Sequence, residues 1–258
     1  MGEPHITVSG LTMAYGDAVI QRDMNFTVNR GDIFIVMGGS GCGKSTLLRH
    51  LTGLKQPVGG SVFFQNLNFW DASPKERRRQ MMKMGVSYQS GALFSSMTLA
   101  ENIALPLTAF SSLTRAEIRE IVSLKLALVG LAGFEGYYPA EISGGMQKRA
   151  GLARAMALDP DILFFDEPSA GLDPISSKLL DDLILHLRDN LGATIVVVTH
   201  ELSSIFAIGN NSVFLDAESK TIIAQGDPQR LLQECEVVKV RRFLTRGDSA
   251  DKSQGIHQ

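Results

Sequence analysis

Apolar residues are grouped along this chain in short blocks, and the spacing inside each block predicts its structure. Residues 6–8 and 26–28 alternate apolar and polar side chains, as half-buried strands do. Residues 32–37 instead form an almost continuous apolar run that stops at glycines, which suits a strand covered on both faces of a parallel sheet. Residues 61–65 are expected to add another strand to the first, alternating group.

Two later apolar runs, at residues 161–166 and 193–199, predict further buried strands. Residues 45–51 and 176–190 have the spacing of helices and lie between predicted strands. In the second of these helices we expect four leucines on one side: Leu179, Leu180, Leu183 and Leu187. Strands that alternate with helices favour βαβ units around a parallel sheet, so the expected fold class is α/β.

The stretch from about residue 91 to residue 138 differs from the rest of the chain. Helical patterns cover residues 99–107 and 115–129, and no buried-strand run interrupts them. This predicts a helical lobe inserted into the α/β core. The last residues, 247–258, are polar and are expected to be frayed.

Composition narrows the class of protein. With 258 residues the chain can bury a substantial core, as one large domain or as a domain with a smaller lobe. A formal net charge of −2 argues against a general nucleic-acid binder. The two cysteines, Cys42 and Cys235, suit a reducing cytosol rather than a disulfide framework. The N-terminus lacks the pattern of a signal peptide, and the longest apolar runs fall short of the roughly 20 residues that cross a bilayer, so we expect a soluble protein.

A glycine-rich segment follows the first continuous apolar run. It reads Gly38-Gly39-Ser40-Gly41-Cys42-Gly43-Lys44-Ser45 and continues with Thr46. Glycines at these places, with a strand before and a helix after, are typical of a loop whose backbone N–H groups hold phosphates. Lys44 is expected to reach the β- and γ-phosphates, Ser45 to bind Mg²⁺, and Thr46 to add a phosphate contact. The segment, here called the P-loop, predicts nucleotide binding.

Three more polar residues end predicted strands. Asp166 suits a role in organising Mg²⁺, and Glu167 suits a general base that orients and deprotonates the attacking water. We expect their strand to lie beside the strand that precedes the P-loop. His200 follows the strand at 193–199, at the end where open α/β sheets bind ligands, and is expected to contact the γ-phosphate and hold the water near Glu167. The alternatives are acids before a proline turn and a structural histidine.

The segment Ile142-Ser143-Gly144-Gly145-Met146-Gln147 resembles the signature sequence of ABC-type ATPases, usually written LSGGQ. It precedes the acidic strand by the usual distance and opens a predicted helix, with Ser143 as a plausible N-cap. The N–H groups at residues 143–145 are expected to direct the positive helix end at an anion. A glycine turn that caps a core helix is the alternative interpretation.

Other motifs match this family in order. Gln89 resembles the Q-loop glutamine, which senses Mg²⁺ and the attacking water. Residues 169–173 resemble the D-loop and place Asp173 at the nucleotide. Tyr15 is placed like the aromatic residue that stacks on adenine, although an exposed tyrosine in a turn is the alternative.

The resemblance covers roughly residues 5–240 and implies a P-loop NTPase of the ABC ATPase type. Such a fold has a RecA-like core with an antiparallel β subdomain and an inserted α-helical subdomain, here at about residues 91–145. Residues 241–258 would form a C-terminal tail.

The resemblance also implies a head-to-tail homodimer or pseudodimer in which each ATP lies between one subunit's P-loop and the other's Ser143, Gly144 and Gly145. ATP binding then holds the halves together, and hydrolysis loosens them. A subunit of this kind works on separate transmembrane permease chains, through the cleft near Gln89 and the helical lobe. Its place is the cytoplasmic face of the bacterial inner membrane.

Met146 stands where the family usually has glutamine. Together with residues 89–94 and 101–107 it resembles the ATPases of Mla/Mce-type lipid transporters, which move phospholipids between the envelope membranes of Gram-negative bacteria. That resemblance implies a periplasmic Mce-domain protein and a small STAS-domain protein as further partners. The Mla type contacts the latter through a longer C-terminal extension than residues 247–258 provide.

Three alternatives remain. A polar-solute importer ATPase, for amino acids or ions, would make Met146 a neutral change; gene neighbours would separate the two transporters. A non-transport ABC protein usually carries two cassettes or a long coiled coil, whereas this chain has one P-loop and one signature segment. A P-loop kinase or GTPase would leave the signature segment and His200 unexplained.

Overall fold

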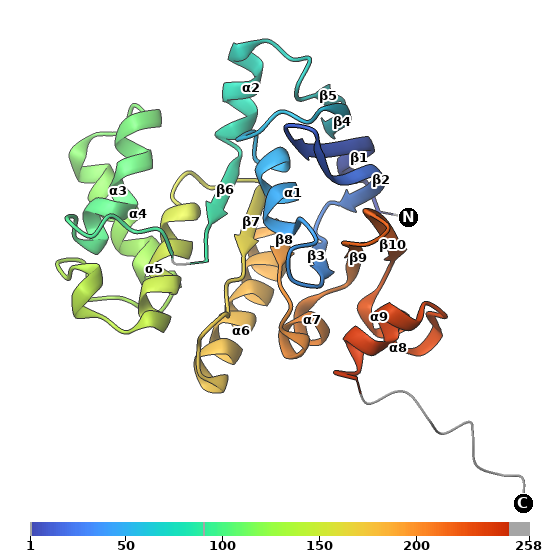
Figure 1. The fold of residues 1–258 in the computed structure, drawn as a ribbon. Coiled ribbons are helices and arrows are strands. Elements are labelled where there is room, and N and C mark those ends of the chain that lie inside the picture. The colour runs from blue at the N-terminus through green and yellow to red at the C-terminus, as the bar shows by residue number, and fades with distance from the viewer. Residues whose placement is uncertain (1, 90, 248–258) are drawn as a thin grey trace, which may run out of the picture.

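The computed structural model describes residues 2–89 and 91–247 (Figure 1). A four-stranded antiparallel sheet has the order β2-β1-β4-β5. A six-stranded sheet has the order β10-β9-β3-β8-β7-β6 and is parallel except for the β9–β10 pair. The strands are β1 (Pro4–Tyr15), β2 (Ala18–Asn29), β3 (Ile33–Gly38), β4 (Gly59–Phe64), β5 (Leu67–Asn68), β6 (Met84–Ser87), β7 (Ile162–Asp166), β8 (Thr194–Val198), β9 (Asn211–Asp216) and β10 (Thr221–Gln225).

The order of the large sheet corrects one prediction. The acidic strand β7 does not lie beside the P-loop strand β3, because β8 pairs with both of them and separates them. Local apolar patterns predict that a strand forms but not which partner it pairs with. Strands β3, β7 and β8 all run in the same direction, so their carboxyl ends still lie at one edge of the sheet, as a shared site requires.

Both faces of the large sheet are covered, as its continuous apolar strands predict. On β3, Ile33, Ile35 and Met37 pack in one apolar core with the helices, including α6 and those of the helical lobe. The alternating residues Phe34 and Val36 pack in a second core, which contains the antiparallel sheet and the first helix. The expected α/β fold with an antiparallel β subdomain is confirmed.

The helices are α1 (Lys44–Leu51), α2 (Pro74–Met81), α3 (Leu99–Phe110), α4 (Arg115–Leu128), the short 3-10 helix η1 (Pro139–Glu141), α5 (Gly144–Ala155), α6 (Pro174–Leu191), α7 (Leu202–Ile208), α8 (Pro228–Glu234) and α9 (Val238–Leu244). Helices α3, α4 and α5 stand together as a lobe at one side of the sheet (Figure 1). Capping boxes start two of them, with Thr98 and Thr114 accepting from backbone N–H groups three residues later. Within the described residues, no helix has the length and apolar character that a membrane span needs.

The buried face of α6 differs from the predicted one. Leu180, Ile184 and Leu187 are buried and follow the i, i+4, i+7 spacing of a helical stripe. Leu179 is 53% exposed, so its assignment to the apolar face was wrong. It lies one residue, or about 100°, away from that stripe.

The predicted boundary after residue 240 falls inside α9. Val240 and Leu244 are buried, and the ring of Phe243 meets that of Phe214 edge-on with 5.1 Å between centroids. The packed part of the chain therefore continues to Leu244. The remainder of the predicted tail, residues 248–258, lies outside the described residues.

Asp181 of α6 is a buried carboxylate that gives the fold a pH dependence. Ser204 Oγ of α7 donates a hydrogen bond to its Oδ2 at 2.9 Å, but burial raises the pKa of Asp181 to about 6, and the nearby charges of Asp182 and Glu201 act in the same direction. The folded state thus holds this proton more tightly than the unfolded chain, where the pKa is about 3.9. The carboxylate therefore lowers the free energy of unfolding progressively as pH rises from about 4 to about 6.

We expect Asp181→Asn to remove this titration. The variant should gain stability relative to the wild type as pH rises through that window, by at most about 3 kcal/mol at pH 7.5. Urea unfolding of both proteins at pH 4.5 and at pH 7.5 measures the gap. An equal gap at the two pH values would contradict the assignment.

Candidate functional site

The P-loop joins β3 to α1 in a conformation that glycine makes possible. Gly38 has φ 146°, and a Cβ there would lie 2.4 Å from the carbonyl oxygen of Leu215 on β9 and 2.8 Å from Cys42 Sγ. Cys42 is buried beneath the loop, while Gly39, Ser40 and Gly41 are exposed. The loop therefore rests on the sheet through Gly38 and Cys42, with Gly39, Ser40 and Gly41 toward solvent, which suits phosphate binding.

The end of the P-loop leaves an anion-binding surface open. Helix α1 begins at Lys44 with Gly43 as its N-cap, with no side-chain cap and no acidic residue in its first turn. Its first N–H groups therefore have no side-chain acceptor at the cap, and the helix dipole favours a negative ligand there. Lys44 Nζ donates hydrogen bonds to the loop's own carbonyls, Gly38 O at 2.9 Å and Gly39 O at 3.0 Å. These residues fit a bound triphosphate.

Ser45 and Asp166 come together as predicted. Ser45 Oγ, in the first turn of α1, donates a hydrogen bond to Asp166 Oδ1 at the end of β7, at 3.1 Å. Burial raises the pKa of Asp166, and the Ser45 bond opposes this shift. A hydroxyl and a carboxylate are oxygen ligands that Mg²⁺ prefers. No cluster of three or more His, Cys, Asp or Glu side chains suited to a metal occurs in the described part of the chain.

Glu167 and His200 lie in contact at the carboxyl ends of β7 and β8. Glu167 Oε1 lies 2.8 Å from His200 Nδ1, and the Glu167 side chain is 12% exposed. Its Oε2 is buried and has no hydrogen-bond partner among residues 2–89 and 91–247. Its backbone has φ 50°, a left-handed conformation that non-glycine residues adopt rarely and often at functional sites. The structure thus brings the predicted pair of Glu167 and His200 together. The buried carboxylate oxygen that has no donor could accept a hydrogen bond from a water molecule.

Gln89 and Tyr15 lie on other elements of the site: Gln89 follows β6, whose Ser87 pairs with Phe165, two residues before Glu167, and Tyr15 ends β1. Gln89 is exposed in the turn after β6. Burial raises the pKa of its neighbour Tyr88, and the charge of nearby Asp166 acts in the same direction. Tyr15 is 45% exposed, and Lys55 Nζ lies 3.1 Å above the centre of its ring. Arg49 donates a hydrogen bond to the Tyr15 hydroxyl at 3.2 Å. Stacking on adenine thus remains a prediction, with one ring face covered by a cation.

The signature segment lies at the start of α5. Ser143 is the N-cap, as predicted, and its Oγ accepts from Met146 N at 3.2 Å. Gly144 and Gly145 form the first turn, and Met146 packs partly against the apolar core. Asp173 caps α6 and accepts from Ile175 N and Ser176 N at 3.0 Å each, so its place at the nucleotide stays a prediction.

The P-loop and the signature segment do not meet within one chain. Helix α5 packs on β6 and on α3, α4 and α6, whereas α1 packs on β3, β7 and β8 (Figure 1). Two basic residues of α5, Lys148 and Arg154, were not among the predicted site residues. They connect the signature helix to the segments that follow β7 and β6. Lys148 Nζ donates to the carbonyl of Ala170, three residues after Glu167, and Arg154 donates to Gly91 O and Ala92 O at 3.1 and 2.8 Å. In the sequence these two residues look like ordinary basic residues on the solvent-facing side of a helix, so their contacts could not be predicted.

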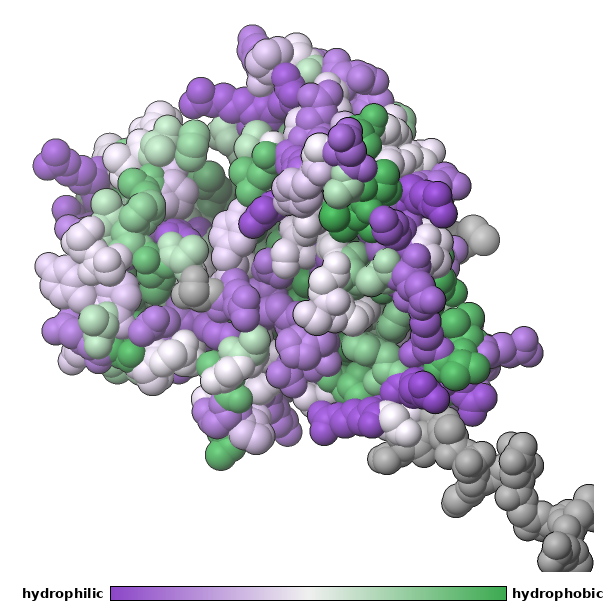
Figure 2. Space-filling view, viewed as in Figure 1, coloured by the Kyte–Doolittle hydropathy of each residue, from purple (hydrophilic) through white to green (hydrophobic). Residues whose placement is uncertain are grey.

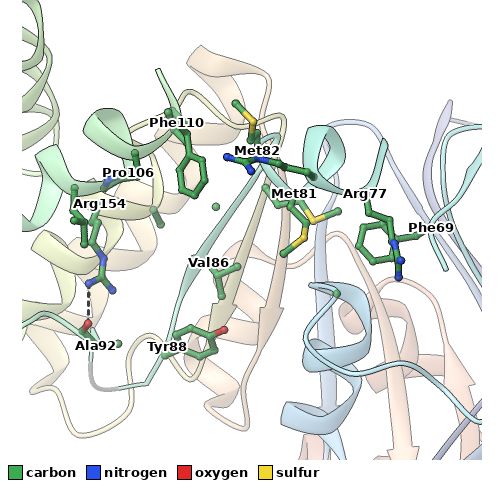
Figure 3. Close-up of a pocket in the computed structure, with 18 of the residues that line it drawn as sticks. Phe69, Arg77, Met81, Met82, Val86, Tyr88, Ala92, Pro106, Phe110 and Arg154 are labelled. Carbon is green, nitrogen blue, oxygen red and sulfur yellow. Dashed lines mark hydrogen bonds between the residues drawn. The ribbon is translucent and has the colours of Figure 1, made fainter. Parts of the chain in front are cut away.

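A large groove separates the helical lobe from the core. Its volume is about 730 Å³, and α2, β6, α3 and α5 supply most of its walls. Figure 2 shows the surface hollowed there, with apolar residues lining the hollow. Apolar side chains line most of it, among them five aromatic residues and three methionines. Figure 3 shows Arg77 and Arg154 at the groove, and Arg78 is its third charged residue within the part of the chain that the structure describes. The described residues that line it include no Asp or Glu.

Comparison with known proteins agrees with this geometry. A family profile described as ABC transporter matches residues 21–170. The intermembrane phospholipid transport system ATP-binding protein MlaF of Haemophilus influenzae is 39% identical over 96% of this chain and 93% of its own length. The probable ribonucleotide transport ATP-binding protein mkl of Mycobacterium tuberculosis is 42% identical over 93% of this chain, which spans 66% of that relative, slightly under two thirds.

Two solved structures show the same fold at 27% identity. One is cbiO1 from Clostridium perfringens, part of the ABC transporter complex cbiONQ, with a TM-score of 0.82 over 95% of this chain and 97% of that one. The other is a dimeric, post-hydrolysis state of the ATP-binding cassette MJ0796 bound to ADP and Pi, with a TM-score of 0.78 over 86% of this chain and 98% of that one. This chain therefore belongs to the family of ABC transporter ATP-binding proteins.

Proposed function

We propose that this chain is the ATP-hydrolysing subunit of a transporter that moves phospholipids across the bacterial cell envelope through separate transmembrane permease chains. One observation supports hydrolysis above all: the buried, unpartnered Oε2 of Glu167 at the carboxyl end of the sheet that also carries the P-loop. The lipid cargo is supported by the likeness to MlaF over nearly the whole of both chains.

The chain's own residues divide the work of hydrolysis. ATP would supply the γ-phosphoryl group, and the Mg²⁺ bound with it would neutralise part of the charge on that group. Lys44, with the N–H groups of the P-loop, would hold the phosphates, and Ser45 and Asp166 would hold Mg²⁺, with Gln89 completing its surroundings. Glu167 Oε2 accepts a proton from the water that it orients. His200, whose Nδ1 lies 2.8 Å from Oε1, would keep the carboxylate in place and contact the γ-phosphate of bound ATP.

The signature helix points to a second copy of the chain. The positive end of α5, with Ser143, Gly144 and Gly145, lies away from the P-loop of its own chain and would complete the nucleotide site of a partner subunit. The related cassette MJ0796 has a dimeric structure bound to ADP and Pi, which supports this arrangement. Asp173 and its loop would then lie along the subunit interface.

The groove is the proposed docking place of the permease. Its apolar floor and its three arginines, without a lining carboxylate, fit a helical segment that carries apolar residues and acidic flanks. Such docking places the subunit on the cytoplasmic face of the inner membrane. An Mce-domain protein and a small STAS-domain protein are proposed as further members of the complex.

A matched pair of variants tests this docking. Leu105 of α3 is 37% exposed and lines the groove, whereas Leu124 of α4 is 56% exposed and does not. We expect Leu105→Asp to reduce permease recovery on affinity purification of the tagged subunit from membranes at least tenfold, because it buries a charge at the contact. ADP affinity should be unchanged, and Leu124→Asp should purify with the permease like the wild type. Equal recovery with both variants would rule out the groove.

The same purification tests the cargo. We expect phospholipid bound to the purified complex, and ATP hydrolysis that phospholipid stimulates. A complex that hydrolyses ATP only with a soluble binding protein loaded with an amino acid or ion would instead support the polar-solute importer and refute the lipid assignment.

A further inference from the structure

Gln21 on β2 is a fully buried amide beneath the P-loop. It is 0% exposed, and its Nε2 donates hydrogen bonds to Cys42 O at 2.7 Å and to Asp216 O at 2.9 Å. Both partners are carbonyl oxygens, which can only accept, so the amide nitrogen must face them. The other amide atom, Oε1, is buried with no hydrogen-bond partner in the described part of the chain.

The carbonyl that Gln21 holds controls the direction of a P-loop N–H group. Cys42 C=O and Gly43 N–H belong to one peptide unit, and the two groups point in opposite directions because a trans peptide is planar. Fixing Cys42 O against Gln21 therefore directs the Gly43 N–H to the opposite side of the loop. Gly43 has φ 101°, a conformation that favours glycine. Because a glycine backbone rotates more freely than that of other residues, glycine alone does not fix the direction of this N–H group.

The second carbonyl bound by Gln21 gives it a firm support. Asp216 ends β9, and its Oδ2 accepts from Ser219 N and Ser219 Oγ at 2.8 Å each. These bonds, with Lys239 of α9, lower the pKa of Asp216 to about 2. Arg22, next to Gln21, donates its backbone N–H to Lys220 O at 2.9 Å. Hydrogen bonds thus stabilise the turn between β9 and β10 internally and join it to α9 and to β2.

The unpartnered Oε1 argues that the fold alone does not need this amide. An apolar side chain of the same length would fill the space without burying an acceptor that lacks a donor, which is unfavourable in a folded protein. What an apolar residue cannot supply is the pair of hydrogen bonds to Cys42 O and Asp216 O.

We propose that Gln21 is a positioning residue of the nucleotide site, which holds the Cys42–Gly43 peptide so that the Gly43 N–H is set for a phosphate before the nucleotide binds. The proposal rests on the P-loop being the nucleotide site. Such preorganisation raises affinity because the loop does not have to be ordered during binding.

Gln21→Met separates this role from a structural one, since methionine matches the length of glutamine but donates no hydrogen bond. We expect the affinity for Mg²⁺–ADP, measured by isothermal titration, to fall about tenfold. The melting temperature of the nucleotide-free protein should change little, because removal of the unpartnered acceptor offsets the loss of the donor to Cys42 O and Asp216 O. An affinity within twofold of the wild type, or a loss of affinity accompanied by a comparable loss of melting temperature, overturns the proposal.

Two further variants complete the test. Gln21→Asn keeps an amide but shortens it by one methylene, so it should also lose affinity; it decides by the same criteria if the methionine variant does not fold. Asn102 is the matched control, because it is 0% exposed and donates to three backbone carbonyls of the helical lobe. Asn102→Leu should lower the melting temperature and leave ADP affinity unchanged. A wild-type protein that does not bind ADP would refute the proposed function itself.

Discussion

Replacing Glu167 by glutamine is expected to abolish ATP hydrolysis while ATP binding is retained. The amide keeps the shape of the side chain but cannot accept a proton from water, and loss of a general base typically costs 10²–10⁴-fold in rate. The site itself should persist, because the side chain is only 12% exposed and a neutral group is less costly to bury than a carboxylate. ATP-bound dimers should therefore accumulate.

Phosphate release by the purified permease complex measures the first effect, and size-exclusion chromatography of the subunit with ATP measures the second. Glu201→Gln is the matched control, because it removes a negative charge from the residue directly after His200, at the N-cap of α7, without touching the Glu167 carboxylate. That variant should hydrolyse ATP within about threefold of the wild type. Turnover at the wild-type rate in Glu167→Gln would remove Glu167 from the role of base.

The parts of the site that follow from local rules were predictable from sequence. The P-loop combines an apolar strand, glycines and a helix start, and all three are encoded within residues 33–51. The same holds for Ser143, because an N-cap needs only its own side chain and an N–H group three residues later. Interactions of this range are visible in a single stretch of sequence.

Three strands of the large sheet, β6, β9 and β10, escaped prediction, and for the first two tertiary contacts explain why. Strand β6 contains Gly85, where a Cβ would lie 2.1 Å from Ala155 O of α5, so close packing and not β propensity selects the residue. Strand β9 begins with two polar residues, whose side chains are satisfied from afar: Asn211 donates to Asp32 Oδ2 at 3.0 Å and Ser212 to Gly226 O at 2.6 Å. Buried polar residues of this kind look like a surface loop in the sequence.

Strand order and backbone strain also lie beyond local patterns. Because α6 connects β7 to β8 and β8 inserts between β7 and β3, the approach of Asp166 to Ser45 depends on crossovers that the apolar runs do not specify. The left-handed backbone of Glu167 is likewise set by its neighbours, including the bond from its N–H to Val198 O at 2.8 Å. Residues at functional sites are where local preference and tertiary structure are expected to disagree.

A second large effect is expected from Gly145→Asp at the signature helix. A Cβ at Gly145 would lie 3.4 Å from Ser176 Oγ, which is an ordinary contact, so the monomer should fold. A carboxylate in the first turn of α5 even favours the helix dipole. In a head-to-tail dimer, however, the same carboxylate would face the γ-phosphate bound by the partner, and such like-charge contacts cost several kcal/mol. Hydrolysis should therefore fall at least 100-fold.

Gly145→Asn provides the control, because it has nearly the same shape without the charge. We expect it to retain most of the hydrolysis, while both variants bind Mg²⁺–ADP as monomers with the wild-type affinity. ATP turnover of the permease complex and sedimentation of the subunit with ATP report the two steps separately. If the aspartate variant hydrolyses ATP as fast as the asparagine variant, no phosphate lies opposite Gly145, and the P-loop must work without the signature helix of a second subunit.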